Sequence, residues 1–296
     1  MKRLFFLFCA MLLAAQGLSA QTMPLLYAPA DARSASLGGT GVALEADAWA
    51  MENNFAQAVI STRHFSIGAA YDRWAPQPAA DNRFAAGGWY SYNRFAFGLS
   101  AKGSFAPAYE AVSPGGATLD PFQPSDLSAA LGLAWSPMPG FALSAAARLV
   151  SSSLALEARA TGVCADLGLA YSSTLFRVGL SVANLGGRLR FGNTEAPLPT
   201  RIRGGGTLLL NCLSFTVEAD YLSGAGLMAG TGIEFRPVSI LALRAGYHYG
   251  PADKGVPSFG SCGLGLLYKG LGLDVAFLFA SPTIGGSLCA GLSYSF

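Results

Sequence analysis

The stretch from Leu127 to Ala147, LSAALGLAWSPMPGFALSAAA, is the part of the sequence that decides the fold. It is uncharged and long enough for a membrane-spanning helix, which needs about 20 apolar residues. Its middle, Ser136-Pro137-Met138-Pro139-Gly140, consists of residues that reverse the chain rather than continue a helix. The stretch therefore predicts two strands joined by a hairpin.

Bulky apolar residues recur at every second position on both sides of this turn. Leu131, Leu133 and Trp135 alternate with Gly132 and Ala134, which is typical of a strand with one apolar face. The same alternation recurs along the chain in segments about 9 to 11 residues long, enough to cross a bilayer when tilted. The segments are centred near residues 68, 87, 98, 131, 146, 167, 179, 205, 217, 232, 243, 264, 275 and 291.

These fourteen segments predict an all-β fold, a transmembrane antiparallel β-barrel of about 14 strands. The face opposite the bulky residues is mostly Gly, Ala and Ser, with few charged residues. A secreted β-sandwich is the alternative, but it would place its charged residues outward in water. A strand face whose side chains are this small and this rarely charged favours the lumen of a barrel.

The composition and the first residues indicate export from the cytoplasm. Only 12% of the 296 residues are charged, against about 25% in a soluble domain. Lys2 and Arg3 precede the apolar run Leu4 to Leu13, and small residues end at Ala20, which predicts a signal peptide over residues 1–20. Removal of the signal peptide leaves 17 of the 19 basic residues, which equals the number of acidic residues, 17. The net charge of the remaining chain is therefore zero and gives no basis for nucleic-acid binding.

The last strand ends in an alternating apolar pattern with an aromatic as the final residue. Leu292, Tyr294 and Phe296 share one face of this strand. The pattern resembles the terminal strand that the barrel-assembly machinery of the outer membrane recognises. We therefore expect Tyr294 and Phe296 to act as the assembly signal, and the protein to lie in the outer membrane with its lipids around it.

Residues 21–62 do not have the strand pattern and are expected to form a plug inside the barrel, which itself covers residues 63–296. Glycines at 38, 39 and 41 permit a positive φ and a close backbone approach. They lack the order and the lysine of a phosphate-binding loop, so we interpret them as a tight turn against the barrel wall. Residues 45–54 are expected to form a short helix.

The sequence resembles a known family in this segment. The run from Ala32 to Ala43, followed by Asp47-Ala48-Trp49-Ala50, is similar to the N-terminal motif of the PorV/PorQ family of outer-membrane proteins, relatives of FadL-type barrels. Further matches are Val182 to Gly186, Leu198-Pro199, Arg201 to Gly206, Leu241 to Tyr247, and Ser293 to Phe296. The candidate plug-motif residues are Arg33, Leu37, Gly38, Gly39, Gly41, Asp47 and Asn54. One departure is Asn54-Phe55-Ala56, where the family usually has Asn-Pro-Ala.

The resemblance implies a fourteen-stranded FadL-like barrel without enzymatic activity that supports type IX secretion by binding secreted cargo or surface-attachment proteins. The candidate partner loop runs from Ser104 to Ser125 and carries Phe105, Tyr109 and Phe122, aromatic residues of the kind that anchor protein interfaces. FadL-like relatives instead pass hydrophobic molecules through a side opening in the barrel wall. A transporter of hydrophobic small molecules is therefore the alternative function.

Charged residues on the lumenal face are expected to pair and to brace the plug, because a buried charge is tolerated only with a partner. Side chains alternate between the two faces of a strand, and this parity places the following charged residues on the lumenal face: Arg94, Lys102, Arg148, Asp166, Arg177, Arg203, Glu218, Asp220, Glu234, Arg244 and Asp274.

Nothing in the sequence indicates an enzyme, a metal or a cofactor. His64 and His248 are the two histidines, and no nucleophile or carboxylate motif accompanies either. The four cysteines beyond the signal peptide are scattered along the chain, and we interpret them as small apolar residues rather than as a disulfide framework. They are Cys164, Cys212, Cys262 and Cys289.

Overall fold

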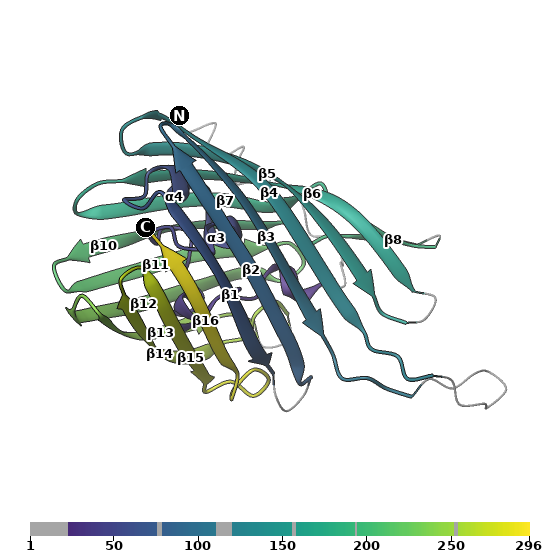
Figure 1. Cartoon of the computed structure of the whole chain (residues 1–296). Coiled ribbons are helices and arrows are strands. Elements are labelled where there is room, and N and C mark those ends of the chain that lie inside the picture. Colours follow the sequence, from purple (N-terminus) through teal and green to yellow (C-terminus); the bar gives the residue numbers. More distant parts are fainter. Residues whose placement is uncertain (1–22, 76–78, 111–119, 156–157, 193, 252–253) are drawn as a thin grey trace.

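The computed structural model describes residues 23–75, 79–110, 120–155, 158–192, 194–251 and 254–296. Fourteen antiparallel strands form one closed barrel, in which each strand pairs with its sequence neighbours and β16 pairs with β1 (Figure 1). The strands of the barrel are β1 (Phe65–Trp74), β2 (Asp81–Tyr92), β3 (Phe95–Phe105), β4 (Ser125–Met138), β5 (Phe141–Ser153), β6 (Arg159–Ser172), β7 (Phe176–Leu185), β10 (Arg201–Leu210), β11 (Leu213–Leu222), β12 (Gly226–Val238), β13 (Leu241–Tyr249), β14 (Phe259–Tyr268), β15 (Leu271–Phe279) and β16 (Leu288–Ser295).

The predicted strand number is confirmed, and each predicted segment centre falls within one of these strands. A separate hairpin was not predicted: β8 (Arg188–Phe191) and β9 (Thr194–Pro197) pair in the connection between β7 and β10. Its strands are four residues long, which is too short for alternation to be recognised.

The predicted alternation is also confirmed. On β3, Phe97 and Leu99 are 57% and 62% exposed on the outer face, whereas Ala96 is buried on the lumenal face. An outer face of large apolar side chains matches the hydrocarbon core of a bilayer. None of the helices in the described ranges is long and apolar enough to span a membrane.

The two ends of the barrel differ in their connections. Turns of two or three residues, such as Asn93-Arg94 and Lys269-Gly270, join strands at the end where β1 begins and β16 ends. The opposite end carries long connections, including residues 106–124 and 186–200. Because short turns face the periplasm in barrels of this type, we call these the periplasmic and the extracellular end, respectively.

Residues 23–62 lie inside the barrel and are called here the lumenal segment (Figure 1). The segment starts among side chains of the extracellular half, such as Leu189 and Leu198, and ends at the periplasmic end, where it joins β1. Its helical turns are short: η1 (Pro24–Leu26), α2 (Ala32–Ser36), α3 (Ala50–Asn53) and α4 (Ala56–Val59).

The predicted helix over residues 45–54 is wrong in extent, because helical structure there is limited to α3. Polar contacts take up the backbone groups before α3. The Asp47 carboxylate accepts a hydrogen bond from the Trp49 backbone N–H at 2.9 Å, and Arg33 donates to the Glu45 carbonyl at 3.0 Å. The bond between Asp47 and Trp49 is local, and local side-chain bonds of this kind compete with helix formation.

The cysteines are free thiols in the structure, with Cys164 and Cys289 buried and Cys212 and Cys262 exposed. Cys262 lies on the outer face of β14, where a small side chain faces lipid. This agrees with their interpretation as small wall residues.

Deleting Phe296 is expected to impair assembly of the barrel. The Phe296 ring is 62% exposed, and it stacks on Phe65 with ring centroids 5.2 Å apart. Its carbonyl also accepts hydrogen bonds from the His64 and Phe65 backbone N–H groups, so the residue closes the seam between β1 and β16. The measurement is the abundance of the deletion variant in outer-membrane fractions. Wild-type abundance would show that the residue carries no assembly signal.

Candidate functional site

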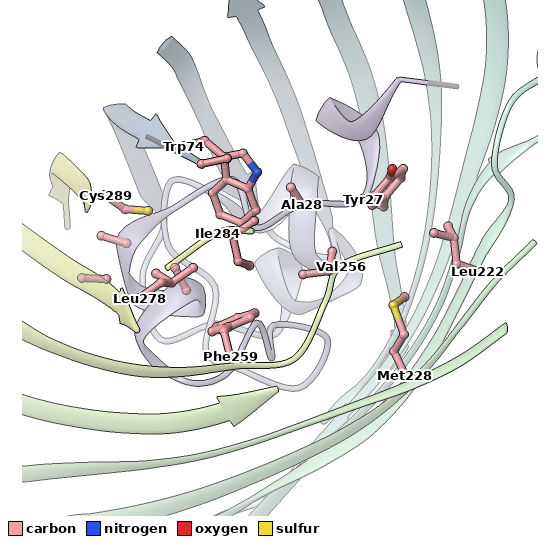
Figure 2. Close-up of a cluster of buried hydrophobic side chains, with 14 residues drawn as sticks. Tyr27, Ala28, Trp74, Leu222, Met228, Val256, Phe259, Leu278, Ile284 and Cys289 are labelled. Carbon is pink, nitrogen blue, oxygen red and sulfur yellow. The ribbon is translucent and has the colours of Figure 1, made fainter. Parts of the chain in front are cut away.

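The extracellular half of the lumen holds a cluster of buried apolar side chains (Figure 2). The lumenal segment supplies Tyr27 and Ala28, and the strand ends supply Trp74, Leu222 and Phe259, among others. The full apolar cluster comprises Tyr27, Ala28, Ala32, Ala35, Trp74, Ala75, Leu222, Met228, Val256, Phe259, Ala276, Leu278, Ile284 and Cys289. Sequence alternation predicts that lumenal positions are small, so these large inward residues near the strand ends were not predicted.

A charged pair lies at the edge of the apolar cluster. The Arg83 guanidinium is 4.4 Å from the centroid of the Trp74 ring, in cation–π geometry. Arg83 also pairs with Asp72 at 3.1 Å and donates to the Pro29 carbonyl oxygen. These contacts hold the lumenal segment against β1 and β2.

Glu52, on α3, is the centre of an ion-pair cluster inside the barrel. Its carboxylate lies 2.7 Å from Lys102 Nζ and 3.0 Å from Arg148 Nη1, and it accepts a hydrogen bond from Ser100 at 2.6 Å. Burial opposes ionisation of Glu52, but Arg148 and Lys102 outweigh it and hold the pKa of this carboxyl well below its usual range. Glu52 was not predicted, because it lies outside any strand pattern.

A second ion-pair cluster joins the start of the lumenal segment to β12, β13 and β15. Arg33, on α2, lies 3.1 Å from Asp47 and 3.7 Å from Glu234. Glu234 also pairs with Arg244 at 2.6 Å, and Arg244 reaches Asp274. The plug-motif residues Arg33 and Asp47 therefore lie in one network.

Asp31 caps α2 and is buried in the same region. Its carboxylate accepts hydrogen bonds from the Ser34 backbone N–H at 2.8 Å and from Asn53 at 3.1 Å. Burial raises the pKa of Asp31 to about 6, and the nearby charge of Asp47 adds to this, while the hydrogen bonds partly oppose it.

The glycine-rich turn lies directly against the barrel wall. Gly38 has φ +71°, and a Cβ there would lie 2.6 Å from the Thr231 carbonyl oxygen and closer still to that of Tyr247. Gly39 also has a positive φ, and the backbone N–H of Gly41 donates to Glu218 at 2.7 Å. Leu37, one residue before the turn, is fully buried.

Asn54, the last predicted plug-motif residue, bridges the lumenal segment to the barrel wall. Its side-chain amide donates to the Val42 and Leu169 carbonyl oxygens, both at 3.0 Å. Its side-chain oxygen accepts from the Ala56 backbone N–H at 3.2 Å. The following Phe55 is buried against Met51 and Trp89 in a second apolar cluster.

The expected pairing of lumenal charges is confirmed for Lys102, Arg148, Arg177, Arg203 and Arg244, each of which has an acidic partner within 4 Å. The prediction for Arg94 is wrong. Arg94 is exposed in the turn between β2 and β3 and donates to the Pro137 carbonyl at 3.3 Å. Strand parity does not apply there, because Asn93 adopts a positive φ and ends the extended backbone.

A narrow pocket of about 30 Å³ lies between the lumenal segment and a break in the strand ladder. The register of β6 against β7 shifts between Ala165 and Leu167, and the chain bulges at Asn184, whose φ is +61°. The pocket is lined by residues from both the outer and the lumenal face of the barrel wall. Leu167 and Val182 face outward, whereas Asp166 and Ser181 face the lumen. We call this the wall pocket.

The two histidines have different surroundings. His248 is buried, with Nδ1 3.2 Å from the Gly38 carbonyl oxygen and its ring stacked on Phe259. His64 is exposed beside Ser91 at the periplasmic end.

Comparison with known proteins finds solved structures with a similar fold. No protein-family model matches the chain, and no curated protein matches it. Among solved structures, the toluene transporter TbuX of Ralstonia pickettii has a TM-score of 0.63 at 16% identity, over 91% of this chain and 97% of that chain. The toluene transporter TodX of Pseudomonas putida has a TM-score of 0.65 at 13% identity, over 94% and 98%.

A FadL homologue of Pseudomonas aeruginosa is also similar, with a TM-score of 0.53 at 13% identity, over 90% of this chain and 95% of that chain. The chain has the FadL-like barrel fold. The relation to FadL-type barrels implied by the resemblance is therefore confirmed for the fold. The comparisons do not support PorV/PorQ in particular.

The candidate partner loop of this FadL-like barrel is partly outside the described residues, since 111–119 are not described. Tyr109 and Phe122 form an antiparallel bridge, with ring centroids 5.8 Å apart in edge-to-face geometry. Phe122 is buried, Tyr109 is 44% exposed, and Phe105 packs edge-on against Phe84. Of the three aromatic residues, Tyr109 presents the most surface to a partner.

Proposed function

We propose that the protein is an outer-membrane transporter of hydrophobic small molecules that acts without enzymatic chemistry. The observation that carries this proposal is the break in the β6–β7 ladder, where residues from both faces of the barrel wall line the narrow wall pocket. The toluene transporters TbuX and TodX share the fold, which supports the same class of substrate.

The arrangement of side chains supplies a route for such molecules. An apolar solute entering at the extracellular end meets the apolar cluster of the upper lumen. The ion pairs around Glu52 fill the lumen beyond it and disfavour an apolar solute, which would separate buried charges. A solute that reaches the wall pocket gains free energy by passing outward, because the hydrocarbon of the bilayer removes its surface from water.

Type IX secretion was the main function implied by the PorV/PorQ resemblance. The similar solved structures are toluene transporters and a monoaromatic hydrocarbon channel, so we propose the alternative function, transport of hydrophobic molecules, in its place. These similarities also support a protein that is not an enzyme and that lies in the outer membrane.

Replacing Leu167 by Trp is expected to slow uptake of naphthalene by cells that express the protein. The larger side chain would obstruct the outer side of the break in the β6–β7 ladder, and uptake should fall about tenfold, equivalent to a barrier higher by about 1.4 kcal/mol. The matched control is Val163→Trp, which places the same ring on the outer face of β6 away from the pocket.

The measurement is the initial rate of labelled naphthalene uptake, with variants expressed at equal levels. Equal uptake by cells with and without the gene, together with a loss of surface-attached proteins from the knockout, would replace transport by the secretion function.

A further inference from the structure

A second pocket, of about 240 Å³, lies at the periplasmic end of the lumen, and we call it the periplasmic pocket. The turn between β10 and β11, Asn211-Cys212, forms part of its rim, and both turn residues are exposed. Leu44 and Glu45 of the lumenal segment line its inner side. Because an apolar cavity of about 150 Å³ is enough to hold benzene, this pocket has room for one such ring with a small substituent.

Arginine side chains from three parts of the fold line the periplasmic pocket. Arg33 belongs to α2, Arg177 is the second residue of β7, and Arg236 lies near the end of β12. Two carboxylates, those of Glu45 and Glu234, line the pocket as well. Among the described residues of this lining, three guanidinium groups therefore face two carboxylates, and positive charge is in excess.

Arg177 is the least satisfied of the three arginines. Its side chain is 17% exposed, and its one ion-pair contact within the described ranges is with Glu45, whose carboxylate is 3.6 Å from Nη2. That distance is too long for a hydrogen bond. A guanidinium has five N–H donors, and a group shielded to this degree normally finds acceptors for them. Arg177 therefore offers donors to a ligand.

Arg33 adds a buried donor to the same pocket. Its side chain is 10% exposed, and Nε has no hydrogen-bond partner in the part of the chain that the structure describes. The carboxylate of Glu234 is 3.7 Å from this nitrogen. Glu234 is shared, since it also lies 2.9 Å from Arg236 Nε and 2.6 Å from Arg244 Nε. The carboxylates of the pocket therefore leave donors for a further anion.

The uncharged part of the lining favours an anion with an apolar body. Leu44 and Leu209 contribute apolar surface, with Cys212 at the rim. Leu209 faces the lumen, because it follows by two positions Thr207, which is buried inside the barrel. An anion held by the arginines can place its body against these residues, and the burial of that surface adds to its affinity.

We propose that the periplasmic pocket binds a small monocarboxylate with an apolar body, such as benzoate, with the carboxylate held by Arg177 and Arg33. A planar carboxylate matches the fork of N–H donors on a guanidinium. The site faces the periplasm, and it shares no lining residue with the wall pocket among the residues described. The inference therefore goes beyond the proposed transport function and does not depend on it.

The test compares benzoate, benzamide and acetate by equilibrium dialysis against the purified protein in detergent at pH 7. Benzoate is ionised at this pH, whereas benzamide has nearly the same shape without the charge. Benzoate should bind at least about tenfold more tightly than benzamide, the effect of a hydrogen bond to a charged group. It should also bind more tightly than acetate, which leaves Leu44 and Leu209 uncovered.

The Arg177→Gln variant should lower the affinity for benzoate about tenfold and leave the affinity for benzamide unchanged, because it removes the charge. Arg177→Lys keeps the charge but loses the fork of donors, so its affinity for benzoate should lie between those of Arg177→Gln and the wild type. The matched control is Arg94→Gln, which removes an exposed arginine at the same end of the barrel that does not line the pocket. Its affinity for benzoate should equal that of the wild type.

Cys212 reports where benzoate binds. Its thiol is exposed at the rim of the periplasmic pocket, whereas the exposed thiol of Cys262 lies on the outer face of β14. Saturating benzoate should slow the alkylation of Cys212 by N-ethylmaleimide several-fold and leave the rate at Cys262 unchanged. Mass spectrometry of the two peptides measures both rates in one sample.

Each part of the proposal can fail separately. Equal binding of benzoate and benzamide would show that the charge is not recognised. Wild-type affinity of Arg177→Gln for benzoate, or unchanged alkylation of Cys212, would place bound benzoate outside the periplasmic pocket. Equal binding of acetate and benzoate would overturn the apolar body. The transport function is tested by naphthalene uptake, so it would stand after any of these results.

Discussion

Replacement of Glu52 by Ala is expected to destabilise the protein by about 3–5 kcal/mol, the usual cost of removing one partner from a buried ion pair. The Glu52 side chain is 5% exposed and is shared by Lys102 and Arg148. Its loss leaves Lys102 without an anionic partner in the cluster, whereas Arg148 keeps Asp166. The larger part of the effect should therefore come from Lys102.

The measurement is urea unfolding of the refolded protein in lipid vesicles, followed by tryptophan fluorescence. Glu52→Gln should lie between the wild type and the alanine variant, because the amide keeps a hydrogen bond but not the charge. The control is Glu195→Ala, which removes an equally paired carboxylate from the exposed β8–β9 hairpin. The control should unfold as the wild type does, since exposed ion pairs contribute little. If Glu52→Ala unfolds at the same urea concentration as the wild type, the ion-pair cluster around Glu52 does not anchor the lumenal segment.

Gly38→Ala is expected to displace the glycine-rich turn from the wall and to cost about 2–4 kcal/mol. An L-residue at φ +71° costs about 1 kcal/mol, and overpacking against fixed neighbours adds about 1–3 kcal/mol. The neighbours here are the Thr231 and Tyr247 carbonyl oxygens. Both belong to the paired strands β12 and β13, so they have little freedom to move.

The matched control for Gly38→Ala is Gly186→Ala. Gly186 has nearly the same φ, +74°, but nothing lies within 4 Å of a Cβ placed there. The difference between the two variants therefore isolates the clash with the wall. Both are measured by the same vesicle unfolding experiment, with limited proteolysis to detect release of the lumenal segment. Equal effects of the two substitutions would mean that the turn does not depend on this close approach.

The strands and their faces were predictable because the signal for them is local. A side chain in extended backbone points to the opposite face from its neighbour, so the order of large and small residues identifies both the strand and its lipid-facing side. Phe97 and Leu99 on the outer face illustrate this. The inward position of Lys102 and Arg148 followed from the same rule, and the rule failed at Arg94 because that residue lies in a turn.

The candidate site was only partly predictable. Arg33, Gly38, Asp47 and Asn54 were selected as a motif, and the structure places all four in contact with other parts of the lumen or with the wall. Glu52 was missed because a carboxylate in an irregular segment gives no pattern of its own. The bulge at Asn184 was missed as well, because the αL conformation of a single Asn is set by its neighbours rather than by its type.

The sequence by itself determined the number of strands and which face of each meets lipid, because both depend on a period of two along the chain. The partners of the buried charges were decided only by the tertiary structure. Glu52 meets Lys102 and Arg148, residues 50 and 96 positions away, because the barrel closes around a segment that passes through its lumen. The wall pocket likewise exists because a shift in register between β6 and β7 lies beside that segment.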